Sequence, residues 1–157
     1  MSHNVIIRAV RIASKDVALR AVEELARERG FKYTVSINGY MRGWNGSTQK
    51  IKGVAVSIEG YPYDLGLLAD ENGQLTPVYE DLVSGAFIDA FGSKNVADKE
   101  NAWSGKGRSD HYKYAIGGFI QRANVIHVED TCAAQGYRTD RSIDTKTGNI
   151  MIVAETY

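Results

Sequence analysis

The residues best suited to bind a ligand lie in one segment, residues 38–50, which reads NGYMRGWNGSTQK. Arg42 could donate two hydrogen bonds to a phosphate or carboxylate, and Trp44 could stack on a base or another ring. The glycines would let backbone N–H groups approach an anion closely. The predicted ligand-binding residues are Arg42, Gly43, Trp44, Asn45, Gly46 and Lys50, with Tyr63 and Arg122 as expected neighbours from elsewhere in the chain.

The same segment also has a purely structural interpretation. It lies between two predicted strands, and glycine-containing loops between strands are common. RGWNG is not an established anion-binding motif, and Trp44 could fold back onto the sheet. The sequence leaves both interpretations open.

Acid–base chemistry has three candidates, Asp64, His111 and His127. Asp64 lies in the middle of a predicted strand, where an inward carboxylate is costly unless it is paired. Arg42 or Arg122 could pair it, but we expect Asp64 to point outward. An enzyme that uses Asp64 with one of the histidines requires these groups to converge in one pocket. No recognisable catalytic set is present, and we assign no catalytic residue.

Metal and cofactor chemistry finds little support. The three histidines are spread along the chain without ligand spacing. Phosphate-binding loops and dinucleotide fingerprints are absent from the sequence. Cys132 is the only cysteine, so an intrachain disulfide is impossible, and we expect it to be a buried small hydrophobe. We therefore predict no metal and no cofactor.

Charge and hydropathy indicate a soluble chain without a polyanionic partner. Lys and Arg number 19, as do Asp and Glu, so the net charge gives little drive toward nucleic acid or a membrane. The beginning of the chain lacks the apolar region of a signal peptide, and no apolar run approaches the ~20 residues of a membrane helix. A cytoplasmic location is expected.

The pattern of apolar residues predicts a single α+β domain over residues 1–157, in which two or three helices pack on one face of an antiparallel sheet. Strands are predicted at residues 4–12, 31–37, 51–58, 63–69 and 74–79, and helices at 14–29, 81–91 and 111–135. A closing hairpin is predicted from 137–143 and 150–156, after a helix that Gly117 and Gly118 could break.

A long polar segment, residues 92–110, separates the two later helices. Connections of this length without apolar periodicity are usually mobile loops, insertions or functional lids. Trp103, in its middle, could pin the segment to the body of the domain or wait for a partner. We predict a mobile loop or an insertion.

Five segments occur in an order that resembles a known family. They are MSH, MRGWNGSTQK, YDLG, QRANVIHVEDTCAAQGY and GNIMIVAE. In this order they resemble the small Ycf-thirty-five-like proteins of plastids, cyanobacteria and phages, a family that carries a domain-of-unknown-function label. Arg42, Gly43 and Gly46 match the family's RGYxG pattern. Trp44 stands at its aromatic position, whereas residues 123–125 replace an aromatic-rich triplet. The resemblance implies a compact α+β domain and no established reaction.

These features favour a non-catalytic binding domain for a small anionic, nucleotide-like ligand or for a protein partner, and they are compatible with a homo-oligomer. The leading site is the loop that carries Arg42 and Trp44. The alternatives are a small enzyme that uses Asp64 and His127 as general acid and base, and an adaptor whose Trp103 segment orders on a partner.

Overall fold

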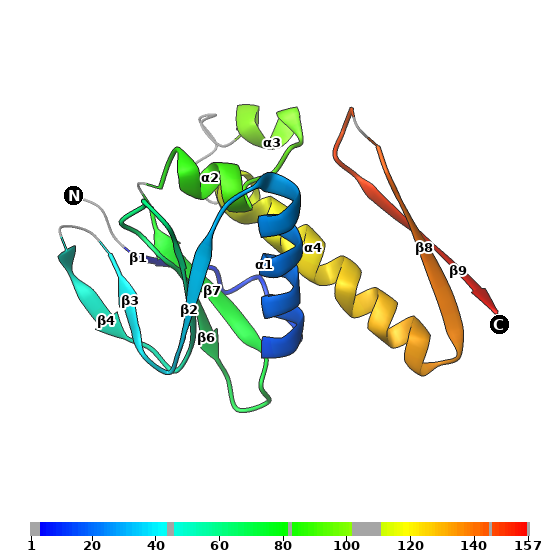
Figure 1. Cartoon of the computed structure of the whole chain (residues 1–157), viewed down its shortest axis with the longest axis horizontal. Helices are drawn as coiled ribbons and strands as arrows, with labels where there is room; N and C mark the ends of the chain where they lie inside the picture. The colour runs from blue at the N-terminus through cyan, green and yellow to red at the C-terminus, as the bar shows by residue number, and fades with distance from the viewer. Residues whose placement is uncertain (1–3, 44–45, 82, 102–110, 145, 157) are drawn as a thin grey trace.

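The computed structural model describes residues 4–43, 46–81, 83–101, 111–144 and 146–156. Figure 1 shows their arrangement. The helices are α1 (Lys15–Arg29), α2 (Ala86–Phe91), α3 (Val96–Asn101) and α4 (His111–Ala134). The strands are β1 (Asn4–Ile6), β2 (Tyr33–Ile37), β3 (Tyr40–Arg42), β4 (Thr48–Lys50), β5 (Gly53–Ile58), β6 (Leu65–Ala69), β7 (Leu75–Glu80), β8 (Tyr137–Ile143) and β9 (Ile150–Thr156).

The centre of the fold is a five-stranded antiparallel sheet in the order β1-β7-β6-β5-β2. Its helix-facing side chains, such as Val54, Val56 and Leu67, form one core with α1, α2 and α4. The prediction of an α+β domain with an antiparallel sheet and packed helices is confirmed. The core consists of apolar side chains that alternate along the strands, as a sheet covered by helices requires.

The second face of the sheet is covered by the β3–β4 hairpin. Met41 and Ile51 pack against Ala55 and Val78 in a smaller buried cluster. Gly66 lies beneath this contact, where an added Cβ would come within 2.6 Å of the Met41 sulfur. The segment that carries the predicted ligand loop is therefore a packed layer of the fold.

Helix α1 follows its sequence signals closely. The hydroxyl of Ser14 accepts a hydrogen bond from the Val17 N–H at 3.1 Å, and Gly30 ends the helix with a left-handed φ of 72°. Its buried stripe contains Val17, Ala18, Ala21, Val22 and Leu25. The predicted helix 14–29 is confirmed, with Ser14 as its cap.

The elements differ from the prediction most clearly in β1, α2 and α4. The first strand ends at Ile6, and only Ile12 pairs again, in a bridge with Leu75. Helix α2 begins at Ala86 because Gly85 has a positive φ of 52°. Helix α4 runs unbroken through Gly117 and Gly118, so the expected break is absent.

The polar segment 92–110 contains α3. Trp103 lies outside the described residues, so its predicted roles remain predictions. The closing hairpin has the predicted bounds, and α4 lies between it and the sheet (Figure 1).

Candidate functional site

Arg42, the leading residue of the predicted loop, is engaged by a buried carboxylate. Its backbone N–H donates to Asp64 Oδ2 at 2.7 Å, and its Nε donates to Oδ1 at 2.9 Å. Its Nη2 also donates to the Tyr61 carbonyl oxygen at 2.7 Å. Asp64 is only 1% exposed, so the expectation that it points outward is wrong. The carboxylate is tolerated inside because it receives both a backbone N–H and a guanidinium.

This pairing fastens the β3–β4 hairpin to the sheet. Arg42 ends β3, whereas Asp64 immediately precedes β6, and the Asp64 N–H in turn donates to the Arg42 carbonyl oxygen at 3.2 Å. The two residues therefore exchange backbone and side-chain bonds at the edge of the hairpin. Arg42 has a structural role whether or not it also meets a ligand.

The glycines of the predicted loop differ in their environment. Gly43 is buried, and its N–H donates to the Ser47 carbonyl oxygen at 2.9 Å, so the hairpin itself uses this donor. Gly46 is exposed and adopts a positive φ of 72°. Trp44 and Asn45 lie outside the described residues, and the predicted stacking on Trp44 remains a prediction.

The remaining predicted ligand residues lie in separate surroundings. Lys50 is exposed opposite Tyr40 on the hairpin. The half-buried Tyr63 packs against Tyr61 in an edge-to-face arrangement, with their ring centroids 5.6 Å apart. Arg122 is only 8% exposed and lies between α4 and α1, where it pairs with acidic residues of α1. Arg42 and Tyr63 thus share the neighbourhood of Tyr61, whereas Arg122 belongs to another part of the molecule.

The three acid–base candidates also have separate partners. Asp64 is paired with Arg42. His111 is buried, with its Nδ1 3.3 Å from the Tyr79 hydroxyl, and burial strongly raises the pKa of that tyrosine. His127 is exposed on α4. This placement gives no support to a shared acid–base pocket for Asp64 and His127.

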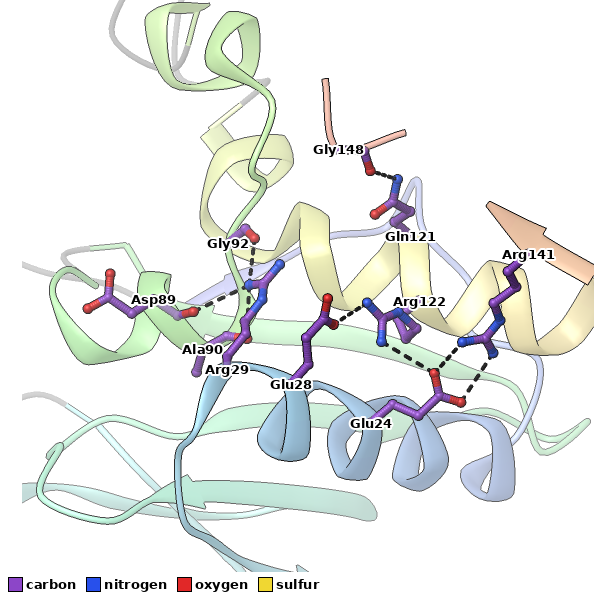
Figure 2. Close-up of polar contacts among 10 residues, drawn as sticks. All are labelled: Glu24, Glu28, Arg29, Asp89, Ala90, Gly92, Gln121, Arg122, Arg141 and Gly148. Atoms are coloured by element: carbon purple, nitrogen blue, oxygen red, sulfur yellow. Dashed lines mark hydrogen bonds and ion pairs between the residues drawn. The ribbon is translucent and has the colours of Figure 1, made fainter. Parts of the chain in front are cut away.

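The densest polar cluster joins α1, α4 and β8 (Figure 2). Arg141 of β8 donates to Glu24 of α1 at 2.7 Å and to Glu129 of α4 at 2.6 Å. Arg122 pairs with Glu28 and, at 3.3 Å, with Glu24. The cluster fixes the closing hairpin against both helices. The sequence pattern does not reveal this cluster, because Glu24 and Arg141 are 117 positions apart.

The cluster predicts an acid-sensitive attachment of the hairpin. Burial alone would raise the pKa of Glu24, but hydrogen bonds and charge from Arg141 and charge from Arg122 bring it below its ordinary 4.5. A lowered folded-state pKa contributes stability above the unfolded value, and this stability is lost as pH falls through the folded value. We expect the free energy of unfolding to drop below pH 4.5 in the wild type and to drop less in Glu24→Gln. Urea unfolding at several pH values measures the free energy of unfolding of the wild type and of Glu24→Gln. The same decrease with falling pH in both proteins would contradict the role assigned to Glu24.

On the other side of α4 lies an apolar groove, called here the α4–β9 groove, with a volume of about 530 Å³. Its apolar lining consists of Val10, Tyr112, Ile120, Val125, Val128 and Ile152. Polar side chains from Asp98, Lys113, Gln121 and Asn124 complete it. An open apolar groove with a polar margin is typical of a surface that receives apolar groups of a partner.

Gln121, at the margin of this groove, also fixes the tip of the closing hairpin. Its Nε2 donates to the Gly148 carbonyl oxygen at 2.8 Å (Figure 2). Helix α4 therefore holds the hairpin through Gln121 at the tip and through Glu129 near the middle of β8. The groove walls are positioned by polar contacts at two points along the hairpin.

The described residues show no metal site and no membrane helix, and known proteins suggest no function for the chain. Within the described ranges, no group of three or more His, Cys, Asp or Glu residues is arranged to hold a metal ion. None of the described helices is both long enough and apolar enough to cross a membrane. No protein-family model matches the chain, and comparisons with curated proteins and with solved structures also find no match. The resemblance to the Ycf-thirty-five-like proteins thus remains a prediction from short motifs.

Proposed function

We propose that the chain is a non-catalytic binding domain for a protein partner, which it contacts through the α4–β9 groove. The observation that carries this proposal is the apolar lining of the groove at the surface of a chain with an ample core of its own. Val128, 44% exposed, forms part of that lining from α4. Exposed apolar surface of this kind is costly in water and is usually retained for an interaction.

The chemistry of the groove favours a peptide segment over a small anion. Among the described residues that line it, Lys113 is the only cation, and Asp98 opposes its charge. The arginines expected to bind an anion are otherwise engaged, Arg42 by Asp64 and Arg122 by Glu24 and Glu28. Apolar side chains on a short segment would instead displace water from Val125, Val128 and Ile152.

A selection from a random peptide library, carried out at low protein concentration, tests this proposal. We expect the selected peptides to be rich in apolar residues and to shift the NMR signals of α4 and β9. Val128→Asp should weaken their binding at least tenfold, because it places a charge on the apolar wall that the peptide covers.

Ile37→Asp is the matched control for this variant. Ile37 is 53% exposed and lies on β2, at the edge of the central sheet, away from the groove lining. The control should bind the selected peptides as the wild type does. Peptides that bind both variants equally, or that shift only the signals of the β3–β4 hairpin, would refute the groove as the binding site.

A further inference from the structure

Strand β9 offers a free hydrogen-bonding edge beside the groove. In the described part of the chain it pairs only with β8. The Asp144 backbone N–H donates to the Asn149 carbonyl oxygen at 2.8 Å, and the Asp144 carbonyl oxygen accepts from the Gly148 N–H at 2.7 Å. These bonds make Asp144 and Asn149 a hydrogen-bonded pair, which decides which residues of β9 bond to β8. Along a strand, the backbone N–H and C=O groups of successive residues point to opposite edges. Met151 and Val153 therefore direct these groups toward β8. Ile152 and Ala154 therefore direct theirs outward.

The two edges of this hairpin differ in composition. β8 reads YRTDRSI and contains three charged residues, Arg138, Asp140 and Arg141, which discourage edge-to-edge pairing. β9 reads IMIVAET and contains only Glu155. Met151 is 65% exposed and Val153 is 47% exposed. An apolar strand with an unprotected edge is a template for another strand.

The free edge and the α4–β9 groove lie on the same side of the hairpin. Arg141 and Ile143 of β8 line a different cavity, together with Glu24 and Glu28 of α1. Ile152 of β9 lines the α4–β9 groove instead. Ile152 thus contributes its side chain to the groove and its backbone N–H and C=O to the adjacent edge. A strand that pairs with β9 would cover the groove at the same time.

We propose that this strand is β9 of a second copy of the chain, in an antiparallel pair whose two-fold axis passes through Val153. The proposal rests on the proposed function, because it names the partner of the same groove. Centring on Val153 uses the full strand and sets Ile152 opposite Ala154 and Met151 opposite Glu155. No two like charges face each other in this register.

The paired edge would also extend the sheet to which the hairpin belongs. An isolated two-stranded hairpin is marginally stable in water, and the β8–β9 hairpin is supported by its packing against α4. Joining two such hairpins through β9 gives one four-stranded sheet across the two-fold axis. The side chains at positions 150, 152 and 154 of each copy would then lie over the apolar groove of the other.

A cysteine on the axis tests the register directly. Because the Val153 backbone groups face β8, Val153 and its symmetry mate form a non-hydrogen-bonded pair with Cα atoms about 4.5 Å apart, within the range that a disulfide bridges. In a Cys132→Ser background, Val153→Cys should form a disulfide-linked dimer under mild oxidation. Met151→Cys in the same background is the control, since the two copies of that residue would lie ~13 Å apart along the strands.

Opposite charges on the axis provide the second test. By sedimentation, the wild type should be a concentration-dependent dimer. Val153→Lys and Val153→Glu should each be monomeric, because the two copies of the new side chain would face each other with the same charge. An equimolar mixture should recover the dimer. A monomeric wild type, a dimer that persists in Val153→Lys, or stronger crosslinking of Met151→Cys than of Val153→Cys would overturn the proposal.

These outcomes separate the inference from the proposed function. If the groove binds protein but not a second copy, the selected peptides still bind the wild type, which stays monomeric. If the second copy is the partner, Val153→Lys opens the groove and binds the selected peptides more tightly than the dimeric wild type does. If the selection yields no peptide that binds the groove of the wild type or of Val153→Lys, the groove itself is not a binding site.

Discussion

Arg42→Ala should lower the free energy of unfolding by about 3 kcal/mol, because it leaves the carboxylate of Asp64 buried without its cation. Asp64 is 1% exposed, and Arg42 Nε donates to it at 2.9 Å. The loss is below the largest values known for buried ion pairs, since the backbone N–H of residue 42 still donates to Asp64 in the variant. The bond from Arg42 to the Tyr61 carbonyl oxygen is also lost.

Urea unfolding of the wild type and the variant measures this difference. Arg27→Ala is the matched control, because Arg27 pairs with Glu23 one helical turn away, with side chains 75% and 60% exposed. An exposed pair of this kind contributes less than about 1 kcal/mol. Arg42→Lys should recover only part of the stability, since an ammonium cannot bond to Asp64 and to the Tyr61 carbonyl in the same forked geometry.

The outcome also decides between the two interpretations of the 38–50 segment. If Arg42→Ala were as stable as Arg27→Ala, Arg42 would be dispensable for folding, and the interpretation of the segment as an anion-binding loop would be favoured. If the variant is destabilised as expected, a loss of ligand binding in it could follow from a loosened hairpin. A binding assay at Arg42 is therefore informative only beside the unfolding measurement.

Local signals in the sequence were sufficient for the elements that depend on local chemistry. α1 begins and ends where Ser14 and Gly30 predict, because a cap and a left-handed glycine act within one helical turn. The bounds of β8 and β9 were equally predictable from two strand-forming runs and the turn between them. In both cases the interacting residues are neighbours in the chain.

The features that depend on distant residues were not predictable. The direction of Asp64 is decided by Arg42, 22 positions away on a hairpin that folds over the second face of the sheet. The α4–β9 groove combines Val10 with residues of α4 and β9, so no single stretch of sequence contains its pattern. Both Ile120 and Ile126 lie on α4, yet Ile126 is buried in the core, whereas Ile120 packs against the edge of the core and also lines the groove.

The glycine pair of α4 shows how a local rule is overridden by packing. Gly117 and Gly118 would weaken an isolated helix, but α4 continues through them because other backbone lies directly against it. An added Cβ on Gly118 would come within 2.4 Å of the Gly92 carbonyl oxygen and 2.6 Å of Arg29 Nη2. That guanidinium also caps the end of α2, donating from Nη1 to the carbonyl oxygens of Ala90 at 3.1 Å and Gly92 at 2.9 Å (Figure 2).

Gly118→Ala should therefore lower the free energy of unfolding by about 3 kcal/mol, despite the ~1 kcal/mol that alanine gains over glycine in a helix. The new methyl group must push away both the Gly92 carbonyl group and the Arg29 side chain, and each movement breaks the cap of α2. Burial lowers the pKa of Arg29, so this guanidinium is poorly solvated and has few alternative partners once displaced.

Gly117→Ala is the control one position away on the same helix. The nearest atom to its added Cβ is the Ser93 Cβ at 3.0 Å, which a small shift can relieve. We expect its free energy of unfolding to lie within about 1 kcal/mol of the wild type, since the helical preference for alanine offsets the crowding. Thermal and urea unfolding of the two variants compare them directly. If both alanines were tolerated equally, the close approach of Gly92 and Arg29 to α4 would not be what requires glycine at position 118.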